Sequence, residues 1–183
     1  IAGYEDDHTQ GPACAISCGA GTIYRQYFVE VNGRTGQTED NQIDCLSGLA
    51  EYFENERFNY WTTRNGYAFP TEAGILRLTE IINACSPDQR KTLLGKLRIG
   101  LQWNTEVTTS ERRHSVSQAY CSALPVLYSS IPSTRWEAFA RLVLEATYEA
   151  TFHSALLNRE RTGCNKLFLT LVGGGAFGNK DEW

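Results

Sequence analysis

The stretch LFLTLVGGGAFGN, residues 167–179, constrains the fold of this chain more than any other segment. It begins with an almost continuous apolar run, and three consecutive glycines follow directly. Such a run is typical of a strand that is buried on both faces of a parallel sheet. In open α/β sheets, ligands bind just beyond the carboxyl ends of these strands. The segment therefore predicts a buried strand over 167–172 that leads into either a ligand loop or a tight turn.

The two interpretations of the glycines call on different properties of the residue. Glycine permits positive φ angles, which a tight turn can require. It also lets a phosphate approach main-chain N–H groups without a Cβ in the way. Spacing alone leaves both interpretations open.

The rest of the chain predicts alternating helices and strands. Asn65-Gly66 between strand-like runs predicts a hairpin. Helical periodicity predicts helices over 41–56, 71–85 and 135–158, and Thr71 is the expected N-cap of the second. Apolar runs predict strands over 96–103 and 116–123. The strand, long helix and strand from 116 to 172 would form a right-handed crossover unit, so we predict an α/β fold of three layers, a mixed sheet flanked by helices.

Composition restricts the partners of the chain. Its 183 residues are most simply one α/β domain over 1–183. The net charge is −4 and the basic residues are scattered, which argues against a nucleic-acid partner. Apolar runs are too short to span a membrane, so we expect no membrane partner.

The chain begins at Ile1 and contains no Met, which favours a processed or partial chain with terminal elements missing. The oligomeric state is left open.

The six cysteines are spread along the chain and lie beside small or apolar residues. This is not the dense pattern of a small disulfide-stabilised secreted domain. We interpret them as reduced, partly buried thiols of an intracellular, cytoplasmic protein, although an even number leaves disulfides open. No metal site and no cofactor are predicted. Glu145, Glu149 and His153 share one side of the long helix, but one helix does not make a metal site.

The sequence VGGGAFGN, 172–179, resembles the second phosphate loop of macrodomains, which are α/β modules that bind ADP-ribose. The pattern in that family is an apolar strand, then Gly-x-Gly-x-aromatic-Gly, and Gly173, Gly175, Phe177 and Gly178 match it. The likeness is specific over about ten residues and topological over about sixty. The Asn-rich early segment of the family is not seen. The only candidate for the first glycine-rich loop is DDHTQGPACAI, 6–16.

The resemblance implies a macrodomain-like fold and binding of ADP-ribose or a related nucleotide diphosphate, a nucleotide-type small molecule. The enzymatic extension would be hydrolysis of an ADP-ribosyl bond, with Asp7 or a residue upstream of Ile1 positioning a water molecule. The ligand-binding residues that it implies are Gln10, Gly11, Gly173, Gly174, Gly175, Ala176, Phe177, Gly178 and Asn179.

Two alternatives come from other functional classes. Cys121, at the end of a predicted strand, could serve as the nucleophile of an amide or ester hydrolase with His114 or His153 as its base. In the second alternative the chain is a noncatalytic structural or interaction protein, whose glycines only pack and whose many aromatic residues contribute to a partner surface.

Overall fold

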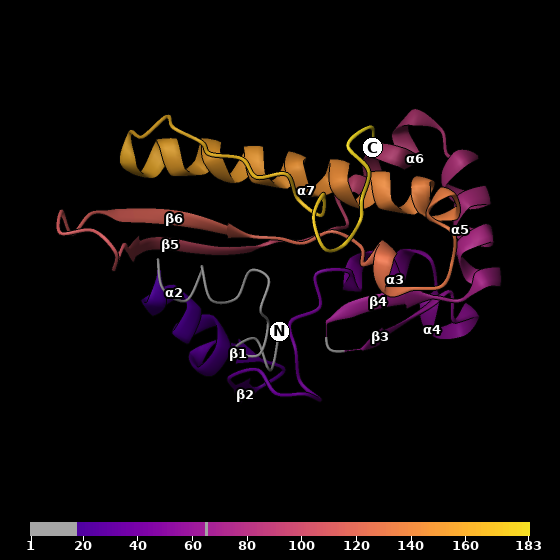
Figure 1. Ribbon diagram of the computed structural model, residues 1–183, viewed down its shortest axis with the longest axis horizontal. Coiled ribbons are helices and arrows are strands. Elements are labelled where there is room, and N and C mark those ends of the chain that lie inside the picture. Colours follow the sequence, from indigo (N-terminus) through magenta and orange to yellow (C-terminus); the bar gives the residue numbers. More distant parts are fainter. Residues whose placement is uncertain (1–17, 65) are drawn as a thin grey trace. The chain divides into compact units, whose positions relative to one another are not determined.

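A computed structural model of the protein describes residues 18–64 and 66–183. The fold is mixed α/β, as predicted, and combines helices with two-stranded antiparallel sheets (Figure 1). Contacts divide the chain into two compact units. The first consists of the described part of Ile1–Asp44 with Leu101–Tyr120, and the second consists of Cys45–Gly100 with Cys121–Trp183. The single domain over 1–183 stays a prediction.

The first unit contains a short helix and two small hairpins. The α-helix α2, Gly19–Ile23, continues into a π-helical turn, η2, Tyr24–Phe28. Strand β1, Glu30–Val31, pairs with β2, Arg34–Thr35, and β5, Gly100–Glu106, pairs with β6, Ser115–Tyr120. Asn32 and Gly33 connect β1 and β2, and both have positive φ angles, of 50° and 74°. This geometry explains the Asn-Gly pair, because tight hairpin turns favour these two residues.

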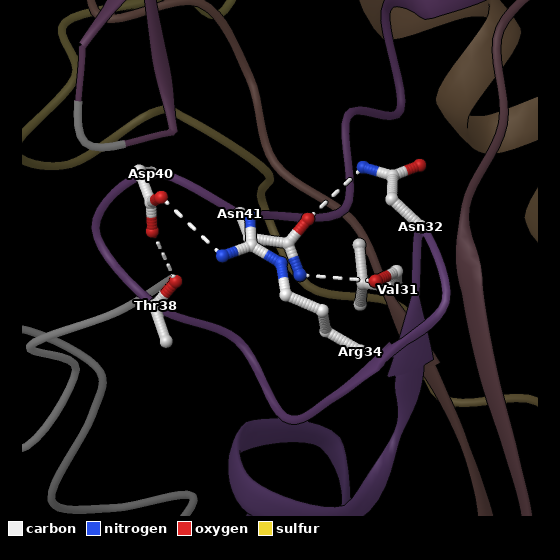
Figure 2. A network of polar contacts seen from close by, with 6 residues as sticks. All are labelled: Val31, Asn32, Arg34, Thr38, Asp40 and Asn41. Carbon is white, nitrogen blue, oxygen red and sulfur yellow. Dashed lines mark hydrogen bonds and ion pairs between the residues drawn. The ribbon is translucent and has the colours of Figure 1, made fainter.

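The buried side chain of Asn41 closes the loop that follows β2 (Figure 2). Its Nδ2 donates to the carbonyl oxygen of Val31 at 3.0 Å, and its Oδ1 accepts from Nδ2 of Asn32 at 3.0 Å.

The neighbouring residue Asp40 has polar contacts of its own. The Thr38 hydroxyl donates to its carboxylate at 2.6 Å, and Arg34 lies 3.4 Å from the same carboxylate. The hydrogen bond from Thr38, and then the charge of Arg34, lower the pKa of Asp40.

Replacing Thr38 by alanine should raise the pKa of Asp40 toward its ordinary value, because the largest cause of the depression is removed. The stabilisation linked to this carboxylate is present above the unfolded pKa of about 3.9 and is lost as the pH falls through the folded value. A carboxyl ¹³C NMR titration measures the change, with Thr35→Ala as a control outside the contact. An unchanged Asp40 titration in Thr38→Ala would contradict this account.

The second unit contains most of the helices. Its hairpin joins β3, Trp61–Arg64, to β4, Tyr67–Pro70, as the Asn-Gly pair predicted. The helices are α3, Ser47–Tyr52; α4, Asn55–Phe58; α5, Glu72–Asn83; α6, Pro87–Leu94; the 3₁₀ turn η3, Val126–Tyr128; and α7, Ser133–Thr162. Helices α5 and α7 pack together over the core. Fully buried core side chains include Leu49, Ile75, Leu78, Leu93, Trp136, Phe139 and Leu142.

Local capping signals fix several helix boundaries in this unit. Thr71 accepts a hydrogen bond from the amide of Gly74 at 2.9 Å, which confirms it as the N-cap of α5. Ser86 and Gln89 form a reciprocal capping box at the start of α6. The helix predicted over 41–56 is instead two short helices, because Glu54 adopts a left-handed conformation with φ 52°. The Nδ2 of Asn55 then donates to the carbonyl oxygen of Trp61 at 3.0 Å, and its Oδ1 accepts from the amide of Trp61 at 3.1 Å.

The strand predicted over 167–172 is not formed, and the crossover unit that would end on it is therefore wrong. Residues 163–171 lie outside any strand and are exposed. A strand exists only where a neighbouring strand accepts its main-chain hydrogen bonds. Within the described residues, no strand supplies that partner.

Candidate functional site

The glycine-rich loop after Val172 closes on itself through main-chain hydrogen bonds. The amide of Gly178 donates to the carbonyl of Gly175 at 3.0 Å, and the amide of Asn179 donates to the carbonyl of Gly173 at 2.9 Å. Gly173 and Gly178 have positive φ angles, of 78° and 68°. Gly173 and Gly178 are therefore needed for the turn itself, which supports the tight-turn interpretation at these two positions.

The glycines also differ in the space that a Cβ atom would have at each position. A Cβ at Gly173 would collide with the side chain of Ala123, and one at Gly178 would collide with that of Leu127. A Cβ at Gly175 would have no other atom within 4 Å. Neither turn geometry nor packing thus requires glycine at position 175. The close approach of a ligand to the main chain would be a reason for glycine at this position.

Asn179 anchors the loop to the rest of the unit. Its side chain is buried, and its Nδ2 donates to the carbonyl of Leu124 at 2.8 Å. Its Oδ1 is buried and has no partner among the described residues. The contacts that the structure gives Asn179 are therefore contacts to the main chain that hold the loop in place.

Three consecutive amides of the loop have no acceptor in the part of the chain that the structure describes. No hydrogen bond among the described residues uses the N–H groups of Gly175, Ala176 or Phe177. Gly175 and Ala176 are also exposed. Successive main-chain N–H groups of this kind are available to an anion. Residues 179–183 form no helix, so any attraction here comes from the amides themselves.

An aromatic cluster adjoins these amides. The rings of Tyr67, Tyr128 and Phe177 meet edge to face, with centroid separations of 5.4–5.6 Å. The amide of Leu127 donates to the carbonyl of Phe177 at 3.0 Å, which ties the loop to η3. The sequence predicted a role for Phe177 alone. Tyr67 and Tyr128 come from β4 and η3, and no spacing in the sequence signals that they meet.

The loop thus provides hydrogen-bond donors and an aromatic surface side by side. Such a pair of features can bind a phosphate together with a planar or sugar-like group. Three other predicted site residues, Asp7, Gln10 and Gly11, lie outside the described residues. The structure therefore neither joins them to the loop nor separates them from it.

The candidate nucleophile Cys121 has a raised pKa. Burial raises the pKa of its thiol, and a hydrogen bond with Thr151 opposes this only in part. A thiol with a raised pKa is protonated near neutral pH and is a poor nucleophile. His153, one of its two suggested bases, is largely exposed and lies 3.7 Å from Glu149. These observations argue against the hydrolase alternative.

The acidic side chains of α7 that could have contributed to a metal site, Glu145 and Glu149, form ion pairs instead. Glu145 forms an ion pair with Arg90 at 2.6 Å, and Glu149 pairs with His153. Within residues 18–64 and 66–183, no cluster of three or more His, Cys, Asp or Glu could hold a metal ion. Cys85, Cys121 and Cys164 are free thiols.

One cleft of the second unit, of about 540 Å³, lies between α5, α6 and α7, and no residue of the loop lines it. Its two arginines, Arg90 and Arg141, are paired with Glu145 and Glu137, so the charges in it are compensated. No helix in the described part of the chain is both long and apolar enough to cross a membrane.

Comparison of the chain with protein-family models, with curated proteins and with solved structures found no match. The basis for a function is therefore the geometry of the loop and the resemblance of its sequence to a macrodomain phosphate loop.

Proposed function

We propose that this protein binds ADP-ribose or a related nucleotide diphosphate at the loop 173–179. The observation that carries the proposal is the run of three amides, on Gly175, Ala176 and Phe177, that have no acceptor in the described part of the chain. Hydrogen bonds to a charged acceptor contribute about 1.5–3 kcal/mol each. Three of them would be a substantial part of the roughly 8 kcal/mol that corresponds to micromolar affinity.

The aromatic cluster favours a nucleotide over a free phosphate as the ligand. Tyr67, Tyr128 and Phe177 adjoin the amides, and Tyr128 is exposed. Aromatic faces stack on bases and cover sugars. In this proposal the diphosphate contacts the amides, and the ribose or base contacts the rings.

The macrodomain-like three-layer fold belongs to the same proposal. It is supported by the order of the long helix α7, an apolar segment and the glycine-rich loop, and by the residues that match the family pattern. Hydrolysis of an ADP-ribosyl bond, with Asp7 positioning water, is a proposed extension. A cytoplasmic location belongs to the same proposal, and free thiols at Cys85, Cys121 and Cys164 agree with it.

Titration calorimetry of the full chain with ADP-ribose, ADP, AMP and NAD tests the proposal. We expect ADP-ribose and ADP to bind more tightly than AMP. Gly175→Glu places a carboxylate beside the amides and should weaken ADP-ribose binding at least about tenfold, equivalent to about 1.4 kcal/mol. The control is Gly19→Glu, which makes the same change of charge at another glycine with open space around it. Absence of binding by every diphosphate, or equal binding in Gly175→Glu, would refute the proposal.

A further inference from the structure

A short apolar segment follows α7, and residues 165–171 are here called the strap. Gly163, with φ 74°, ends α7, and the chain then runs back beside that helix (Figure 1). Tyr148 of α7 holds the far end of the strap. Its hydroxyl donates to the carbonyl of Thr170 at 2.8 Å and accepts from the amide of Val172 at 3.0 Å. The strap therefore has a fixed attachment at one end.

The strap exposes an unusual amount of apolar surface. Phe168 is 88% exposed, and Leu167, Leu169 and Leu171 are exposed as well. Phe152, Leu156 and Leu157 on α7 are each about half exposed. With side-chain areas of about 150–200 Å² for such residues, these exposures leave on the order of 700 Å² of apolar surface.

The main chain of the first part of the strap, 165–169, has no hydrogen-bond partner among the described residues. No hydrogen bond among the described residues uses the N–H or C=O groups of residues 165–169. The apolar run of the segment is nearly continuous, as in strands that are covered on both faces. An extended apolar segment with an unpaired main chain is a template for pairing with another strand.

We propose that the strap pairs antiparallel with the strap of a second copy of this chain, which forms a symmetric dimer. Two identical straps supply each other with the missing strand, and the surface of each is close to the roughly 800 Å² per partner of a standard interface. Charge favours the antiparallel direction. Parallel pairing would place Lys166 beside Lys166, whereas pairing centred between Phe168 and Leu169 keeps the two lysines apart.

Analytical ultracentrifugation of the full chain tests the dimer. The wild type should pass from monomer to dimer as concentration rises. Leu169→Lys places a charge in the paired strand and should raise the dissociation constant at least about tenfold, whereas Leu76→Lys makes the same substitution on α5 and should leave it unchanged. The two side chains are matched, at 49% and 48% exposed. A wild type that stays monomeric, a Leu169→Lys variant that dimerises normally, or open-ended aggregation would overturn the proposal.

The direction of pairing has its own measurement. Cys164 is exposed and lies just before the strap. Antiparallel pairing would separate nitroxide labels on the two copies of Cys164 by about 30 Å, from the rise per residue of a strand. Electron–electron double resonance on a variant that keeps only this cysteine should give that distance. A separation below about 15 Å would indicate parallel straps and would contradict the proposed pairing.

Discussion

Replacing Phe139 by alanine is expected to destabilise the second unit by about 3–5 kcal/mol. The Phe139 side chain is fully buried at the contact between α7 and the hairpin, and its ring centroid lies 5.4 Å from that of Trp61. Truncation removes the transfer free energy of the ring and leaves a cavity that the surrounding core cannot fill completely. Urea denaturation followed by circular dichroism measures the loss.

Phe168→Ala is the matched control for this prediction. It makes the same chemical change at a side chain that is 88% exposed, so its expected effect is within about 0.5 kcal/mol. The comparison is made at high dilution, where the proposed dimer is dissociated. Equal destabilisation by the two variants would show that Phe139 does not occupy the core.

Gly173→Ala is expected to destabilise the protein by about 2–5 kcal/mol. The left-handed conformation at this position costs a residue with a Cβ about 1–2 kcal/mol. The added methyl group would also collide with Ala123, and such overpacking typically costs about 1–3 kcal/mol. The free energy of unfolding measures both effects together.

The control for Gly173 is its neighbour in the same loop. At Gly175 the φ angle is not positive and the space around a Cβ is open, so Gly175→Ala should change stability by no more than about 0.5 kcal/mol. If both alanine variants were equally destabilised, the glycines would have no separate roles. If both were neutral, the turn described here would be wrong.

Local signals in the sequence predicted much of the second unit. The N-cap at Thr71, the Asn-Gly hairpin and the apolar stripe of the long helix each depend on residues close together in the chain. Such signals are read from spacing and side-chain type alone. The long helix extends beyond its predicted ends, to Ser133–Thr162, because helical periodicity locates a helix better than it locates the ends.

The segment 167–172 shows what local signals cannot decide. Its nearly continuous apolar run is a property of the segment, but strand formation depends on a neighbour elsewhere in space. Leu167, Phe168 and Leu169 are exposed because no strand among the described residues covers them. The prediction of a buried strand was therefore wrong, because the apolar sequence does not specify the neighbouring strand that burial requires.

The candidate site was only partly predictable for the same reason. The glycines and Phe177 form one continuous stretch, so the sequence could predict that they act together. Tyr67 and Tyr128 join them only through the tertiary fold, from about 110 and about 50 residues earlier in the chain. Which glycine serves the turn and which leaves space beside the amides depends on distances to Ala123 and Leu127.

The central claim is that the amides of Gly175, Ala176 and Phe177 bind phosphate oxygens. A ¹H–¹⁵N NMR titration of the full chain with ADP-ribose tests it most directly. We expect the amide protons of these three residues to move downfield and saturate together, with smaller changes at Tyr67 and Tyr128. Adenosine, which carries no phosphate, should leave the three amides in place. Unchanged positions of these amides with saturating ADP-ribose, or the same shifts with adenosine, would contradict the claim.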